Sequence, residues 1–146
     1  YFLQRYQTVE GSEAEINKYV AEIRFMRGLL YYSKIKQFGD VPWYDKDLQT
    51  SDTEELYKAR DSRDFVLGKV IEPEKSDSEK GRLNKDAART QLARICLYFG
   101  TYMKYHNETP TTEWTSQTLL QKAVSLTETM MNSGNYDIVK ASELQR

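Results

Sequence analysis

The sequence has little of the side-chain chemistry on which most active sites depend. Its 146 residues include one cysteine, one histidine and three prolines. Cys96 cannot form a disulfide within the chain, and no histidine or cysteine cluster shows the spacing of a metal site. His106 lies in a polar stretch and has no serine or cysteine partner in a nucleophile motif, so we expect a surface loop histidine. We therefore expect no enzyme activity, no metal and no cofactor.

Several other classes of function also lack support. The net charge is -1, so there is no basic excess to neutralise nucleic-acid phosphates. No phosphate-binding loop or dinucleotide motif is present. Carboxylates occur in close pairs, such as Asp45 with Asp47, but a glycosidase needs two carboxylates set across a sugar, which adjacency does not indicate. The sequence contains no secretory signal, no lipobox and no apolar run long enough to cross a membrane.

The sequence does contain a long helical pattern that ends at Gly39 to Pro42. Two apolar stripes follow the helical repeat, which indicates two packing partners. The first is Ile16, Tyr19, Val20, Ile23, Met26 and Leu30, and the second is Phe25, Leu29 and Tyr32. Gly28 costs about 1 kcal/mol against alanine inside a helix, so we expect a neighbour to approach closely there. Gly39 is predicted to adopt a left-handed conformation, and Pro42 prevents continuation of the helix.

Three further helices are predicted, and no strand is strongly signalled. One begins at Asp61 or Ser62, buries Val66, Leu67, Val70 and Ile71, and is ended by Pro73. The next is capped by Asn84 and carries the stripe Ala88, Leu92, Ile95, Phe99, Tyr102 and Met103, with Cys96 as an inert core thiol. The last starts near Thr115 or Ser116, carries Leu119, Leu120, Ala123, Val124, Leu126, Met130 and Met131, and is closed by Gly134. Short extended pieces are expected near residues 41–44 and 136–139.

Three blocks of sequence resemble one family. Residues 21–43, AEIRFMRGLLYYSKIKQFGDVPW, are similar to the signature of SusD/RagB surface glycan-binding lipoproteins. Residues 60–63, RDSR, and 82–88, RLNKDAA, resemble later family motifs, and the likeness covers about residues 13–105. It implies an all-α fold of tetratricopeptide-type antiparallel helix pairs, with Ala87, Ala88, Ala93 and Ala123 suited to close crossings.

The resemblance also implies how much of a protein this chain represents. Family members are several times longer, so residues 1–146 are interpreted as a single helical, internal portion. The family extends the helix before Pro73 by about two turns, a run that is missing here. Either this member is shortened, or a segment is missing between Ile71 and Pro73.

The function implied by the family is non-catalytic. Such proteins are held on the extracellular face of the outer membrane by an N-terminal lipid, which would lie outside this chain. They capture oligosaccharides and deliver them to a SusC-like TonB-dependent transporter. Three alternatives remain: a helical-repeat interaction module without sugar affinity, a SusD-like binder of peptide or glycoprotein cargo, and, least favoured, a glycoside hydrolase.

Aromatic residues in loops are the candidates for ligand contact, because sugars offer flat C–H faces and hydroxyls. Trp43 and Tyr44 follow the long helix, and Trp114 precedes the last helix. Each also has a structural interpretation. Trp43 is suited to pack the loop onto the helix, and Trp114 to form a hydrophobic staple at a helix start. None of the three matches a family sugar-binding motif.

Overall fold

The structure is a computed structural model that describes residues 1–71 and 84–136. Its elements in chain order are α1 (Phe2–Arg5), the 3-10 turn η1 (Tyr6–Thr8), α2 (Glu13–Phe38), α3 (Thr53–Leu56), α4 (Arg63–Ile71), α5 (Lys85–His106) and α6 (Ser116–Met131). The only pairing of extended backbone in these ranges is an isolated antiparallel bridge between Val41 and Asp61. The predicted all-α fold is confirmed. None of the described helices is both long enough and apolar enough to span a membrane.

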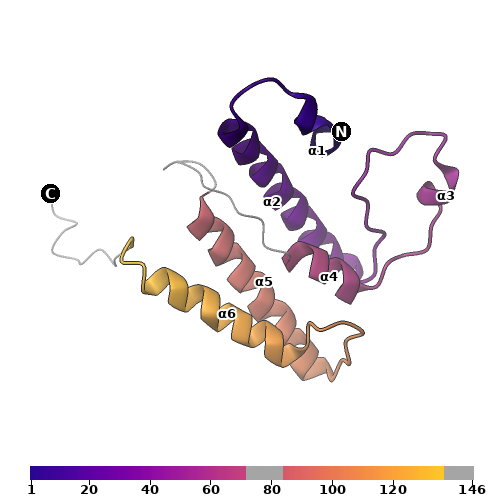
Figure 1. The fold of residues 1–146 in the computed structure, drawn as a ribbon. Helices are drawn as coiled ribbons and strands as arrows, with labels where there is room; N and C mark the ends of the chain where they lie inside the picture. Colours follow the sequence, from indigo (N-terminus) through magenta and orange to yellow (C-terminus); the bar gives the residue numbers. More distant parts are fainter. Residues whose placement is uncertain (72–83, 137–146) are drawn as a thin grey trace, which may run out of the picture.

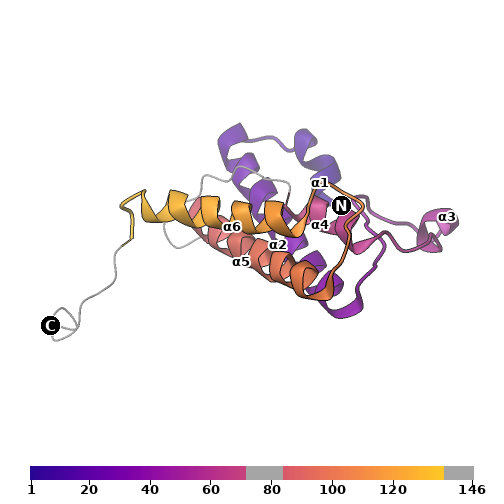
Figure 2. The same cartoon turned by 90° about the horizontal axis from the view of Figure 1, so that it is seen from below.

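The helices form two packed pairs around one core. α5 and α6 run side by side as an antiparallel hairpin, and α4 packs against α2 (Figures 1 and 2). Between α2 and α4 the chain makes a long excursion that carries α3 and projects from the helices (Figure 1). The core consists of Tyr31, Ile35, Val41, Trp43, Val66, Leu67, Ile71, Ile95, Cys96, Phe99, Met103, Leu119 and Ala123. Side chains from all four long helices therefore share one apolar interior.

Only one of the two predicted apolar stripes of α2 packs against the core. Leu29 and Tyr32 of the second stripe pack against the core, as predicted, together with buried Tyr31 and Ile35. In the first stripe Val20 is buried, whereas Tyr19, Ile23, Met26 and Leu30 are 38% to 64% exposed. The prediction of two packing partners is therefore wrong within the described residues, because most of the first stripe is left exposed there.

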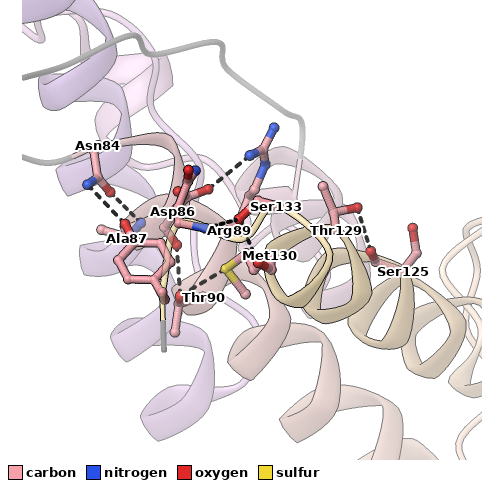
Figure 3. A network of polar contacts seen from close by, with 11 residues as sticks. Asn84, Asp86, Ala87, Arg89, Thr90, Ser125, Thr129, Met130 and Ser133 are labelled. Carbon is pink, nitrogen blue, oxygen red and sulfur yellow. Dashed lines mark hydrogen bonds and ion pairs between the residues drawn. The ribbon is translucent and has the colours of Figure 1, made fainter. Parts of the chain in front are cut away.

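The predicted helix ends are largely confirmed. Asn84 caps α5 by accepting a hydrogen bond from the backbone N–H of Ala87 at 2.7 Å, and Thr115 caps α6 by accepting from Thr118 N–H at 3.2 Å (Figure 3 shows the Asn84 cap). Gly39 follows α2 with φ of 70°, a sign that disfavours a side chain, although its ψ of -115° is not left-handed helical. The side chains of Asn84 and Thr115 thus accept hydrogen bonds from amide groups that a helix start leaves unpaired.

Asp61 and Ser62, the two predicted capping residues of α4, have different roles in the structure. Ser62 Oγ accepts from the N–H of Phe65 at 3.3 Å, as a capping residue should. The N–H of Arg63 instead donates to Asp40 Oδ1 at 2.8 Å, which ties the helix to the end of α2. Asp61 faces the loop, where it accepts from the N–H of Trp43. The choice left open by the sequence is thus resolved in favour of Ser62.

Close helix crossing occurs at Gly100, which the sequence pattern does not single out. A Cβ at Gly100 would lie 2.9 Å from Leu120 Cγ and 3.2 Å from the Ser116 carbonyl, so α5 and α6 touch there. At Gly28 a Cβ would be 4.0 Å from the Val70 carbonyl, an ordinary contact, so the expected close approach is wrong. Of the alanines proposed for crossings, Ala93 and Ala123 are buried, Ala88 is half-buried and Ala87 is exposed.

Other predictions differ at the margins of the helices. Val124 and Met131 are 55% and 72% exposed, because α6 meets α5 along one narrow face. Gly134, with φ of 66°, lies in the turn after α6 and not at its last residue. His106 is exposed as expected but lies in the last turn of α5, with its ring 4.2 Å from that of Tyr102. The predictions for Pro73, Arg82 and residues 137–139, and the proposed gap after Ile71, fall outside the described residues.

Polar side chains make local contacts at the start of α5 and at the end of α6, and one contact joins the two helices. Arg89 pairs with Asp86 at 2.9 Å, and the Thr90 hydroxyl donates to the Asp86 carbonyl at 2.7 Å while lying 3.2 Å from Met130 Sδ (Figure 3). Ser133 Oγ donates to the Met130 carbonyl at 2.7 Å. The Thr90–Met130 contact thus links the two helices at the open end of the hairpin, opposite the loop that carries Trp114.

Candidate functional site

An open depression lies where α4 meets the loop that precedes α6. Its volume is about 320 Å³, and its lining residues are Asp64, Phe65, Gly68, Lys69, Thr112, Glu113 and Trp114. Of the three candidates from sequence, Trp114 borders this depression. The depression brings together two aromatic rings, two carboxylates, an ammonium group and a hydroxyl.

The position of Trp114 depends on a glycine. A Cβ at Gly68 would lie 3.2 Å from the indole Nε1 and 3.4 Å from Cδ1, so the indole rests on the bare backbone of α4. Lys122 of α6 lies over the ring at 5.6 Å from its centroid, and the ring is partly buried against the core. Trp114 directly precedes the capping residue Thr115, where a staple residue is expected. Its predicted packing role is consistent with this placement, and part of the ring still borders the depression.

Two polar contacts hold the loop of residues 107–115 on α4. The N–H of Thr111 donates to Asp64 Oδ2 at 3.0 Å. Arg63 forms an ion pair and hydrogen bond with Glu108, and its guanidinium lies 4.8 Å from the centroid of Tyr102. The loop begins at Asn107, which ends α5 with φ of 52°. These contacts preorganise the wall of the depression, so a ligand would not have to order it.

The side chains around the depression can make stacking contacts and hydrogen bonds. Phe65 is 42% exposed and stands near Trp114 along the same rim. Asp64, Glu113, Lys69 and Thr112 supply hydrogen-bonding groups around these rings. Aromatic faces with nearby polar groups suit a ligand that is flat and apolar on one side and hydroxylated at its edges. Within the described ranges, no three His, Cys, Asp or Glu side chains gather as a metal site would require.

Trp43 occupies a different place, inside the core. Its ring is 9% exposed and lies 4.3 Å from that of Tyr31, with the Arg27 guanidinium 5.1 Å from its centroid. The interpretation of Trp43 as the residue that packs the loop onto α2 describes this arrangement. Its role as a ligand contact stays a prediction, and the covered ring faces weigh against it.

Tyr44 and its neighbours fasten the base of the projecting loop. The N–H of Tyr44 donates to the Tyr31 hydroxyl at 2.8 Å, and its own hydroxyl donates to the Glu55 carbonyl at 2.9 Å. Lys58 Nζ lies 4.9 Å from the centroid of the Tyr44 ring and donates to the Trp43 carbonyl at 2.6 Å. Tyr44 is partly buried by these contacts, so it stands in the structure as a loop anchor, and its predicted ligand contact remains a prediction.

The same anchor contains a carboxylate and an ammonium group that shift each other's pKa. Lys58 Nζ lies 3.1 Å from Asp61 Oδ2. Burial alone would raise the pKa of Asp61, but the hydrogen bonds from Trp43 N–H and Lys58, and the Lys58 charge, lower it below its usual value. Burial alone would lower the pKa of Lys58, and the hydrogen bond and charge of Asp61 raise it. The interaction between Asp61 and Lys58 therefore stabilises the base of the loop.

Several exposed rings were not identified from sequence. Tyr57, Tyr105 and Tyr136 are 86%, 79% and 61% exposed. Tyr105 could have been recognised, because it falls off the apolar stripe of its helix. Tyr57 and Tyr136 follow helices α3 and α6 in irregular segments, where periodicity gives no signal of exposure.

Comparison with known proteins shows the fold. No protein-family model matches the chain, and no curated protein matches it. A SusD-like protein from Bacteroides fragilis superposes with a TM-score of 0.69 at 23% identity, over 94% of this chain and 25% of that protein. A SusD-like carbohydrate-binding protein from Bacteroides vulgatus superposes with a TM-score of 0.63 at 19% identity, over 96% of this chain and 29% of that protein.

These matches confirm the fold that the resemblance implied. The chain spans between a quarter and a third of the length of either structure. The four long helices of this chain thus have the fold of a corresponding part of the SusD-like proteins.

Proposed function

We propose that this chain is part of a SusD-like surface protein that binds a glycan without catalysis, with the depression beside Trp114 as one contact. The observation that carries this proposal is an indole held on Gly68 at the rim of a depression lined by carboxylate, ammonium and hydroxyl groups. One structure of the same fold is described as carbohydrate-binding. A glycan offers the matching surfaces, C–H faces for the rings and hydroxyls for the polar groups.

The test is glycan binding by the complete protein and by two variants. Wild type is first screened against a panel of oligosaccharides by affinity electrophoresis, and the best ligand is measured by calorimetry. Trp114→Ala is expected to weaken binding at least tenfold, on the order of 1.4 kcal/mol or more. Tyr105→Ala is the matched control, since it removes a ring that is 79% exposed and outside the depression.

The outcomes separate the alternatives. Unchanged affinity of Trp114→Ala would exclude the depression as a sugar contact. Absence of binding to every glycan would contradict the proposed function and favour the helical-repeat interaction module. Binding of peptides in place of sugars, lost in the same variant, would favour the peptide or glycoprotein cargo. Release of reducing sugar by the complete protein would revive the glycoside hydrolase.

We further propose the cellular setting that the SusD-like fold suggests. The protein would be held by a lipid on the extracellular face of the outer membrane and would pass oligosaccharides to a SusC-like TonB-dependent transporter. Arg94 and Lys104 are exposed on the solvent side of α5 and offer charges for such a partner. Reversing both charges is expected to reduce co-purification with the transporter. Undiminished co-purification would remove α5 from the partner-facing surface, and transporter-free membranes containing the protein serve as the control.

A further inference from the structure

α2 is apolar on two opposite faces. One face carries buried Ala21, Tyr31 and Ile35, and the last two belong to the core. The other carries Tyr19, Ile23, Met26 and Leu30, with exposed fractions of 50%, 38%, 50% and 64%. At about 100° per residue these two sets point in nearly opposite directions. We call the row formed by Tyr19, Ile23, Met26 and Leu30 the outer stripe.

The spacing of the outer stripe suits a helix as its partner. Its residues are separated by four, three and four positions, which is the alternation of a coiled-coil seam. From residue 19 to residue 30 the stripe rises about 16 Å at about 1.5 Å per residue, or roughly three turns. Single exposed apolar side chains are ordinary, whereas a continuous row along one helix face marks an interaction surface.

Two of the charged side chains of α2 turn away from this row. Arg27 and Lys34 turn toward the covered side, where they lie 5.1 Å and 5.4 Å from the ring centroids of Trp43 and Tyr31. Continuing the same alternation, the next positions are the uncharged Ser33 and Gln37. A face meant for water would carry charged residues at several of these positions.

We propose that the outer stripe packs against an α-helix of the same polypeptide that lies outside these 146 residues. This inference rests on the proposed function, in which the chain is part of a longer SusD-like protein. The matched portion is 25% and 29% of the two SusD-like structures, so most of each chain lies outside it and is available to cover such a face. An intramolecular helix is favoured over a second copy because the linked chain supplies it at high effective concentration.

Cysteine accessibility in the complete protein tests the proposal. Met26→Cys is compared with Ser125→Cys, which replaces an exposed residue in the middle of α6. The native Cys96 is fully buried and its thiol has a pKa raised to about 11, so it does not compete for a maleimide. The thiol at 26 is expected to react at least tenfold more slowly than the thiol at 125, and both should react fully in denaturant.

Each outcome decides the proposal. Equal labelling rates at 26 and 125 would overturn it, and so would protection that disappears on dilution together with a dimer mass in ultracentrifugation. Leu30→Cys repeats the measurement if Met26→Cys fails to fold. Glycan binding is measured on the same preparation. Protection without glycan affinity contradicts the proposed function alone, whereas labelling at 26 in a protein that binds glycan contradicts only this inference.

Discussion

Three helical glycines have different surroundings, although the sequence alone presents them alike. A Cβ would meet the nearest atom at 4.0 Å at Gly28, at 3.2 Å at Gly68 and at 2.9 Å at Gly100. The neighbour at Gly68 is the edge of the Trp114 ring, whereas at Gly100 it is the branched side chain of half-buried Leu120, with the Ser116 carbonyl close by. Alanine raises helix propensity at each position, so the local packing decides the sign of the stability change.

We therefore predict a graded series of alanine variants. Gly28→Ala should raise the free energy of unfolding by about 0.5 to 1 kcal/mol. Gly100→Ala should lower it by about 1 to 2 kcal/mol, because overpacking outweighs the propensity gain. Gly68→Ala should displace the indole and reduce glycan affinity. Urea unfolding measures the first two, and a destabilised Gly28→Ala would show that α2 and α4 approach more closely than described.

Asp61 gives a pH-dependent prediction at the residue scale. Its pKa is lowered below 3.8 in the folded protein despite the opposing effect of burial, so the stability it contributes is present above that pH and is lost as the pH falls through the folded value. Asp61→Asn should destabilise the protein more at pH 7 than at pH 3, because the contribution begins to be lost below pH 3.8. Urea midpoints at the two pH values measure this difference. Equal destabilisation at both would show that the charge of Asp61 is unimportant.

At the scale of elements, α5 depends on the single cap at Asn84. Asn84→Ala is expected to lower the free energy of unfolding by about 1 kcal/mol, because the N–H of Ala87 loses its acceptor. Asn84→Asp is the matched variant, since a carboxylate can cap and also interacts favourably with the helix N-terminus. Thermal unfolding followed by circular dichroism measures both. An unaffected alanine variant would indicate that the cap is replaced by water.

At the scale of the whole molecule, the reactivity of Cys96 reports on cooperative unfolding. This residue lies in the core with no exposed surface. Burial raises the pKa of its thiol to about 11, with only a partial opposing effect from Lys122, so reaction requires opening of the helices. Wild type should react with a thiol reagent at pH 8 only at the rate of cooperative unfolding, and the rate should rise with urea. Rapid native labelling would show that α5 and α6 separate without global unfolding.

The sequence by itself determined the all-α fold, the long helices and their caps, because periodicity, capping side chains and glycine or proline stops act within one or two helical turns. It also identified Ile95, Phe99 and Leu119 as core residues, since each helix must bury its apolar face. Trp43, Tyr44 and Trp114 were recognised as loop aromatics, but their sequence positions did not distinguish anchors from a rim residue.

Only the tertiary structure decided what each face of a helix meets. It placed Trp43 in the core against Tyr31 and Trp114 at the rim of a depression on Gly68, a contact between residues 46 positions apart. It also showed that the outer stripe of α2 is exposed within the described residues, which periodicity cannot reveal because an apolar stripe looks the same whether or not its partner is present. Local patterns fix helices, whereas contacts distant in sequence depend on how those helices pack together.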